Sequence, residues 1–164
     1  AIIIDLRNNG GGKPNAVQLL CSLFMKEGAH LNSIQRRDGN SYRTETWDTL
    51  PHEELPGERR LVGQKVVLLI SPETFSAAES FADSMQALGR ATIIGERSGG
   101  GANPGAYYPI GKDFDIRVPD GRAINPNRQD TGNWDGIGII PDHEVSAKDA
   151  LEKAISFLGE KLPK

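Results

Sequence analysis

The stretch KVVLLISPETFSAAESFADSMQAL, residues 65–88, decides how this chain folds. The unbroken apolar run at residues 66–70 predicts a buried strand, and Pro72 ends it. A helix follows from Ser76, with apolar residues recurring on one face at Phe81, Met85 and Leu88. A strand, a tight turn and a helix in this order suggest an α/β arrangement, with Ser76 at the helix start.

Ser76 is a candidate nucleophile because of this position. Unpaired backbone N–H groups at a helix N-terminus stabilise the oxyanion that forms when a serine attacks a carbonyl. The same residues also fit a simpler structural role. Ser76 and Glu79 have the spacing of a capping box, a common helix-start signal. This segment alone favours the cap, so both interpretations stay open.

The N-terminal stretch AIIIDLRNNGGG, residues 1–12, places three glycines directly after an apolar strand. Glycine has no side chain to block a ligand, so Gly10, Gly11 and Gly12 can form a concave nest of amides for an anion. A nucleotide-binding phosphate loop is excluded because Pro14 stands where its serine or threonine belongs, and the dinucleotide fingerprint lacks its third glycine. The loop therefore suits an oxyanion or an isolated phosphate.

Four motifs occur in order: DLRNNGGG, TFSAAE, GRATIIGE with a glycine run, and NWDGIGIIPD. Together they resemble the tail-specific or C-terminal processing serine peptidases. The branch that they match best includes the tricorn core protease and the repeats of interphotoreceptor retinoid-binding protein. The resemblance extends from Ile2 to about Leu158 and implies a serine endopeptidase that cleaves a polypeptide through an acyl-enzyme, with no cofactor and no metal.

Carried over by position, the resemblance makes Ser76 the nucleophile. It implies an oxyanion hole built from the amide of Ala77 and an amide of the glycine loop, Gly11 ahead of Gly10. A second glycine-rich loop is the candidate wall of the substrate cleft, and it contains Gly99, Gly100 and Gly101. Ordinary loop glycines are the alternative for these three residues.

The general base is where the sequence departs from the bacterial processing peptidases. The position of their catalytic lysine falls here in the glycine run after Glu96, which favours a histidine base from a segment before this chain. Asp135 of NWDGIGIIPD matches an acidic residue that orients this base, although an Asp-Gly pair is also a common turn signal. The histidines of the chain, His30, His52 and His143, fall in no family motif and are predicted to be surface or loop residues.

Two other functions remain as alternatives. Retinoid-binding relatives use the same fold to carry apolar ligands, so a non-catalytic module for a retinoid or a fatty acid is possible. A crotonase-type acyl-CoA enzyme is the second, because glycine amides can polarise a thioester carbonyl. An intact Ser76 and Glu79 weigh against the carrier, and the CoA enzyme requires no serine.

Length and composition agree with a single catalytic-core domain over residues 1–164. The chain is 37% hydrophobic and 25% charged, which is ordinary for a globular protein. A net charge of −3 gives no reason to expect nucleic acid as a partner, and no apolar run approaches the roughly 20 residues that span a bilayer.

Homo-oligomers are possible, and the resemblance favours a secreted or periplasmic location. The single Cys21 has no partner for an internal disulfide and is expected to be buried.

The other segments read as alternating strands and helices. Helices are expected at residues 15–25 and 147–158, strands at 31–36, 41–47 and 91–94, and a hairpin at 107–110 and 114–118, with a further turn at Asp120 and Gly121. The family resemblance implies the crotonase-like or Clp-protease-like fold of repeated strand-strand-helix units. Because the chain opens on a strand without a methionine, we expect it to be part of a longer polypeptide.

Overall fold

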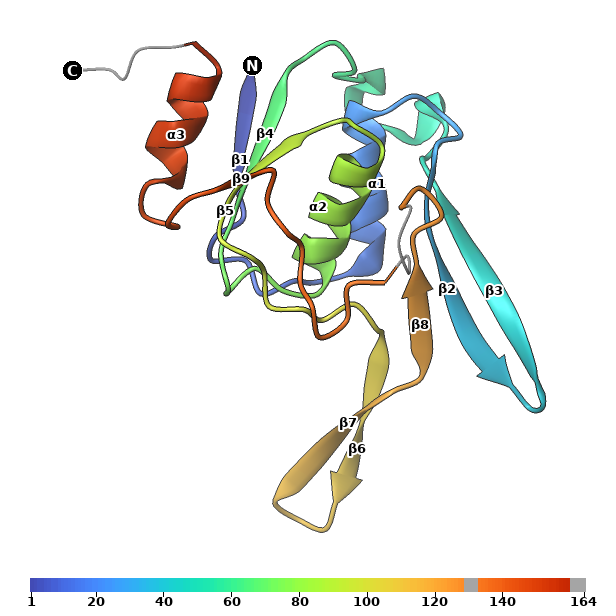
Figure 1. Cartoon of the computed structure of the whole chain (residues 1–164). Coiled ribbons are helices and arrows are strands. Elements are labelled where there is room, and N and C mark those ends of the chain that lie inside the picture. Colours follow the sequence, from blue (N-terminus) through green and yellow to red (C-terminus); the bar gives the residue numbers. More distant parts are fainter. Residues whose placement is uncertain (129–132, 160–164) are drawn as a thin grey trace.

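The centre of the molecule is a parallel sheet, seen in a computed structural model that describes residues 1–128 and 133–159 (Figure 1). Its strands are β1 (Ile2–Asp5), β4 (Val66–Ile70), β5 (Thr92–Gly95) and β9 (His143–Glu144), in the order β1-β4-β5-β9. All five residues of β4 are buried, as the apolar run predicted. Helices cover both faces of such a strand, which explains why it shows no polar alternation.

Three helices enclose this sheet. Helices α1 (Pro14–Phe24) and α2 (Ala77–Ala87) lie on one face, and α3 (Ala150–Phe157) lies on the other (Figure 1). The side chains of β4 alternate between two cores. Leu68 and Ile70 join the core under α1 and α2, and Val67 and Leu69 pack with Ala150 and Ala154 of α3.

A second sheet covers the outer side of α1 and α2. It is antiparallel, with the order β3-β2-β8, and consists of β2 (His30–Asp38), β3 (Ser41–Asp48) and β8 (Gly121–Ile124). Two short 3-10 turns, η1 (His52–Glu54) and η2 (Pro56–Glu58), link β3 to β4. The hairpin of β6 (Gly105–Ile110) and β7 (Phe114–Pro119) projects away from the rest of the molecule (Figure 1). The helix pair is therefore held between two sheets.

The mixed α/β fold and most of the expected elements are confirmed, with three differences. The chain does not turn at Asp120 and Gly121. It continues from β7 into β8, and both amides donate to the Pro104 carbonyl. The strand β9 was not expected. The last helix begins at Ala150, and Leu151, expected in its apolar stripe, is 41% exposed, whereas Ala150 and Ala154 are buried against the sheet. Residues 160–164 of the expected single domain lie outside the described part of the chain.

Candidate active site

Ser76 has an unusual backbone at the start of α2. Its φ of 54° and ψ of −120° make it the only non-glycine residue with a positive φ in the described ranges. Such a conformation costs about 1 to 3 kcal/mol and is found mainly at functional sites, where the surrounding structure enforces it. A strained serine between a strand and a helix is also how several hydrolases expose their nucleophile.

The carboxylate of Glu79 holds this turn in place. Glu79 is fully buried, and its Oε2 accepts the amide of Ser76 at 2.8 Å. The same carboxylate accepts the amides of Gly100 and Gly101 at 2.7 and 2.8 Å, and the hydroxyl of Ser98 at 2.5 Å. Four donors therefore meet on one buried side chain, which joins the start of α2 to the second glycine-rich loop.

The capping box expected from the sequence is present, but Ser76 is more than a cap. The side chain of Ser76 and the amide of Glu79 form one half of the box, and the Glu79 carboxylate with the Ser76 amide forms the other. Ser76 is also only partly buried and lines a cavity. The helix cap is therefore confirmed, and the capping residue is at the same time accessible from the cavity.

The first glycine loop docks directly on the Ser76 turn. The amide of Phe75 donates to the Asn9 carbonyl at 3.0 Å, and the hydroxyl of Thr74 donates to the Leu6 carbonyl at 2.8 Å. Gly11 has a φ of +108°, and a Cβ at this position would lie 2.8 Å from the Cβ of Ser76. Only glycine therefore fits against Ser76 here.

The backbone amides near Ser76 differ in their partners. The amides of Ala77 and Gly10 have no acceptor within residues 1–128 and 133–159. The amide of Gly11 donates to the Asn9 side-chain oxygen at 3.0 Å, and a Cβ at Gly11 would lie 3.1 Å from the Ala77 nitrogen. Ala77 thus presents a free donor at the helix start, and only the absence of a side chain at Gly11 leaves room beside it.

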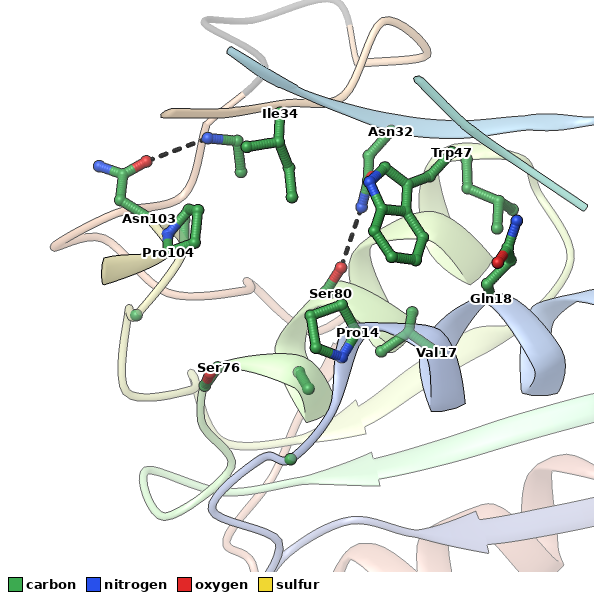
Figure 2. Close-up of a pocket in the computed structure, with 16 residues that line it drawn as sticks. Pro14, Val17, Gln18, Asn32, Ile34, Trp47, Ser76, Ser80, Asn103 and Pro104 are labelled. Atoms are coloured by element: carbon green, nitrogen blue, oxygen red, sulfur yellow. Dashed lines mark hydrogen bonds between the residues drawn. The ribbon is translucent and has the colours of Figure 1, made fainter. Parts of the chain in front are cut away.

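A cavity of about 80 Å³ opens beside Ser76. A water needs only about 10 to 15 Å³, so the cavity has room for a side chain. Figure 2 shows its walls, which come from helices α1 and α2, from strands β2, β3 and β8, and from the second glycine-rich loop. None of the residues that line it is charged, and they are Gly12, Pro14, Val17, Gln18, Leu31, Asn32, Ile34, Trp47, Ser76, Ala77, Ser80, Gly101, Ala102, Asn103, Pro104 and Ala123.

The three glycines predicted to form the cleft take different positions. Gly101 lines the cavity, and a Cβ there would overlap the ring of Phe75. Gly99 packs against Phe75, and Gly100 packs against the backbone of residues 136–138. The second glycine-rich loop therefore reaches the cavity through Gly101 and the residues that follow it.

Asp135 does not line the cavity but supports its wall. Its side chain is exposed, and Oδ1 accepts the amides of Ala102 and Asn103 at 3.0 and 3.1 Å.

The three histidines of the chain also lie away from the cavity. His30 contacts Ser33 and Asp48, His143 packs on the ring of Phe157, His52 is exposed, and none of the three lines the cavity.

An ion pair fixes the end of β1 below the first glycine loop. Arg7 donates to both carboxylate oxygens of Asp5, at 2.9 and 2.6 Å, and to the Ala147 carbonyl at 2.6 Å. These hydrogen bonds lower the pKa of Asp5 below its usual value of 3.8.

The single cysteine, Cys21, is buried in the core, as expected. Burial raises the pKa of its thiol, so Cys21 is a neutral packing group.

Sequence analysis missed the walls that come from distant strands. Asn32 on β2, Trp47 on β3 and Ala123 on β8 meet across more than 90 residues, and no local motif marks them. Pro14, Val17 and Gln18 stand at i, i+3 and i+4 on α1, and this spacing was the available signal for one wall. Ser98 and the four bonds of Glu79 were also missed, because a capping box does not predict further donors.

The described part of the chain has no group of three or more histidine, cysteine, aspartate or glutamate side chains placed to hold a metal ion. Among the same residues no helix combines the length and hydropathy that crossing a bilayer requires.

Comparison with known proteins places these motifs in one family. The chain is 26% identical over 155 residues to carboxyl-terminal-processing peptidase 1, chloroplastic, of Arabidopsis thaliana, covering 94% of this chain and 29% of that protein. It matches a putative peptidase of Parabacteroides merdae at 25% identity with a TM-score of 0.73, covering 95% of this chain and 51% of that one. The tricorn protease shares the fold, with a TM-score of 0.57 at 21% identity over 95% of this chain and 14% of its own. The profile of peptidase family S41 matches residues 1–145, so this chain belongs to peptidase family S41.

Proposed function

We propose that this chain supplies the nucleophile of a serine endopeptidase that cleaves polypeptides. One observation carries the proposal. Ser76 is held in a strained turn at the start of α2, in contact with Gly11 and beside a cavity large enough for a side chain. A residue that served only as a helix cap would need neither the positive φ nor the open space.

In the proposed reaction the Ser76 oxygen forms a bond to the carbonyl carbon of the scissile peptide, and its proton passes to a base. Collapse of the tetrahedral intermediate breaks the carbon–nitrogen bond, and the base returns the proton to the leaving amine. A water molecule then hydrolyses the Ser76 ester, which frees the new carboxylate and restores the hydroxyl. The amide of Ala77 is the donor for the oxyanion because it is otherwise unpartnered.

The second oxyanion donor comes from the first glycine loop. Gly11 lies closest to the Ala77 amide, although its own N–H is held by Asn9. Gly10 has a free amide but lies in open space. We assign Gly11 as the donor, with Asn9 releasing its amide when the oxyanion forms, and Gly10 as the alternative.

The proton acceptor in this proposal is a histidine outside residues 1–164, since none of the cavity-lining residues is a histidine or a lysine. The chain spans about 30% of the length of the curated relatives that it matches, and we propose that it is the catalytic core of a longer polypeptide. Asp135 would then orient the base indirectly, through the amides of Ala102 and Asn103 that it holds.

The lining of the cavity also favours a second candidate, a carrier of an apolar ligand. Val17, Leu31, Ile34 and Trp47 give the cavity largely apolar walls, as in sites for retinoids or fatty acids. A carrier, however, has no use for a strained Ser76 at the mouth of the cavity. The peptidase is therefore the better supported of the two.

A fluorophosphonate probe applied to the complete polypeptide separates these candidates. A peptidase is expected to be labelled on Ser76, to cleave an unfolded protein substrate, and to lose both properties in Ser76→Ala. Ser156→Ala is the control, since this serine is exposed on α3 and does not line the cavity. Cleavage retained by Ser76→Ala, or labelling that moves to another serine, would reject the assignment.

A further inference from the structure

The uncharged wall of the cavity beside Ser76 contains a hydrogen-bonded polar pair. The amide nitrogen of Asn32 on β2 donates to the hydroxyl oxygen of Ser80 on α2 at 3.0 Å (Figure 2). Asn32 is 8% exposed, and both side chains line the cavity. Ser80 follows Ser76 by four residues, so its Cβ lies about 5 to 6 Å, one helical turn, from that of the proposed nucleophile.

The backbone explains how β2 reaches this point. Its pairing with β3 shifts register between His30 and Asn32, and such an irregularity redirects neighbouring side chains. Leu31, Asn32 and Ile34 all line the cavity as a result, although side chains of a regular strand alternate between two faces. The strand thus supplies two apolar walls and one uncharged polar group.

The cavity contains no charge, although a quarter of the residues in the chain are charged. A lysine or aspartate side chain that entered would lose its hydration without gaining an ion pair, and this strongly disfavours binding. An aliphatic side chain of about the length of leucine or methionine would instead contact the apolar residues Val17, Leu31 and Ile34 and lie beside the uncharged pair of Asn32 and Ser80.

We propose that this cavity selects the side chain of the residue whose carbonyl Ser76 attacks, and that Asn32 and Ser80 together determine its charge and length. This inference rests on the proposed function, because it needs the carbonyl to be placed at Ser76. The substrates that it predicts are polypeptides with an uncharged side chain, of leucine or methionine size, on the acyl side of the cleaved bond.

The test uses the complete polypeptide and a set of quenched fluorescent peptides that differ only at this residue. Leucine and methionine peptides are expected to have kcat/KM values at least about 100-fold above those of lysine and aspartate peptides. Asn32→Asp places a carboxylate in the wall of the cavity with almost no change of volume. It is expected to raise the ratio of lysine to leucine cleavage by about 10-fold to 100-fold.

Ser80→Asp delivers a carboxylate to the same point from α2, so it tests the proposal if Asn32→Asp fails to fold. Asn32→Leu is the uncharged control and is expected not to raise the ratio of lysine to leucine cleavage. Fluorophosphonate labelling of Ser76 checks that each variant keeps its nucleophile.

The possible outcomes separate the two proposals. If the folded wild-type polypeptide neither labels nor cleaves, the proposed function fails and this inference fails with it. If the enzyme cleaves but neither aspartate variant changes the ratio of lysine to leucine cleavage, the inference alone is wrong. Efficient wild-type cleavage after lysine or aspartate would also overturn it, because the cavity offers those side chains no counter-charge.

Discussion

The junction at Ser76 and the β6–β7 hairpin are built from opposite kinds of interaction. At the junction a buried carboxylate, Glu79, accepts four donors and holds two loops together. In the hairpin, apolar side chains lie exposed on one face, with Tyr108 opposite Ile116 and Ile110 opposite Phe114. Of these, Phe114 is 75% exposed, whereas Glu79 is 0% exposed.

The contrast shows that hydrophobicity alone does not locate the stable part of this molecule. The hairpin is richer in large apolar residues, but it packs on no core cluster within the described residues. The junction is polar, and its rigidity comes from satisfied hydrogen bonds in a place that water does not reach. Substitutions at the junction should therefore lower the free energy of unfolding far more than substitutions in the hairpin.

The largest effect is expected for Glu79→Ala. This change leaves the amides of Ser76, Gly100 and Gly101 without an acceptor, and each unpaired buried donor costs about 1 to 3 kcal/mol. Allowing for water that enters the new space, we expect a loss of about 3 to 5 kcal/mol in the free energy of unfolding. Urea unfolding measures this loss.

Glu79→Gln is the matched variant, because it keeps the shape but replaces one oxygen with a donor. It should be less stable than wild type but more stable than Glu79→Ala. Fluorophosphonate labelling of the folded variants should also be slower, since the Glu79 carboxylate no longer fixes the turn at Ser76. If Glu79→Ala unfolds like wild type, the carboxylate does not stabilise the junction.

The next largest effect is expected for Thr74→Val, which removes one hydroxyl without changing volume. Thr74 is fully buried, donates to the Leu6 carbonyl at 2.8 Å and accepts the Ser71 amide at 3.0 Å. Losing both bonds should cost about 2 kcal/mol, again measured by urea unfolding. Thr92→Val on β5 is the control, because this partly exposed threonine makes no side-chain hydrogen bond within the described residues. Equal losses for the two variants would contradict the role of the Thr74 hydroxyl.

The sequence predicted the elements whose signals are local. The apolar run of β4 and the periodic faces of α1 and α2 placed these elements to within about one residue of their ends. The short strand β9 was missed because only two residues pair, and those, His143 and Glu144, are polar. The strand β8 was missed because its Asp-Gly start has the signature of a turn, while pairing with β2 decides its conformation.

The candidate site divides in the same way. The motif spacing marked Ser76 and Glu79, and the glycine run marked the loop that approaches them. Three of the four donors on Glu79 lie 19 to 22 residues from it in the sequence, and Asn32 is 48 residues from Ser80. Hydrophobic patterns carry no information about such polar contacts, so these features needed the structure.

A smaller, pH-dependent effect is expected for Asp5→Asn. Arg7 holds the pKa of Asp5 below 3.8 in the folded protein, so the ionised carboxylate stabilises the fold at pH values above 3.8. This stabilisation is lost as the pH falls through the lowered pKa. Because the Asp5 side chain is 50% exposed, its contribution is at most about 1 kcal/mol.

The measurement compares urea unfolding of wild type and Asp5→Asn from pH 7 to pH 3. The difference in the free energy of unfolding should stay constant down to about pH 4 and shrink below it. A difference that persists unchanged at pH 3 would show that the ionised carboxylate is not its source.

The smallest effect is expected for Phe114→Thr in the hairpin. Phe114 loses only its cross-strand contact with Ile110, and threonine keeps a high strand propensity, so the free energy of unfolding should change by about 0.5 kcal/mol or less. Urea unfolding of the complete polypeptide measures it, with Asp115→Thr on the polar face of the hairpin as the control. A loss above about 2 kcal/mol for Phe114→Thr alone would mean that this apolar face is covered in the complete polypeptide, because an exposed side chain has no such energy to lose. The hairpin would then resemble the junction at Ser76, and hydrophobicity would again mark a stable region.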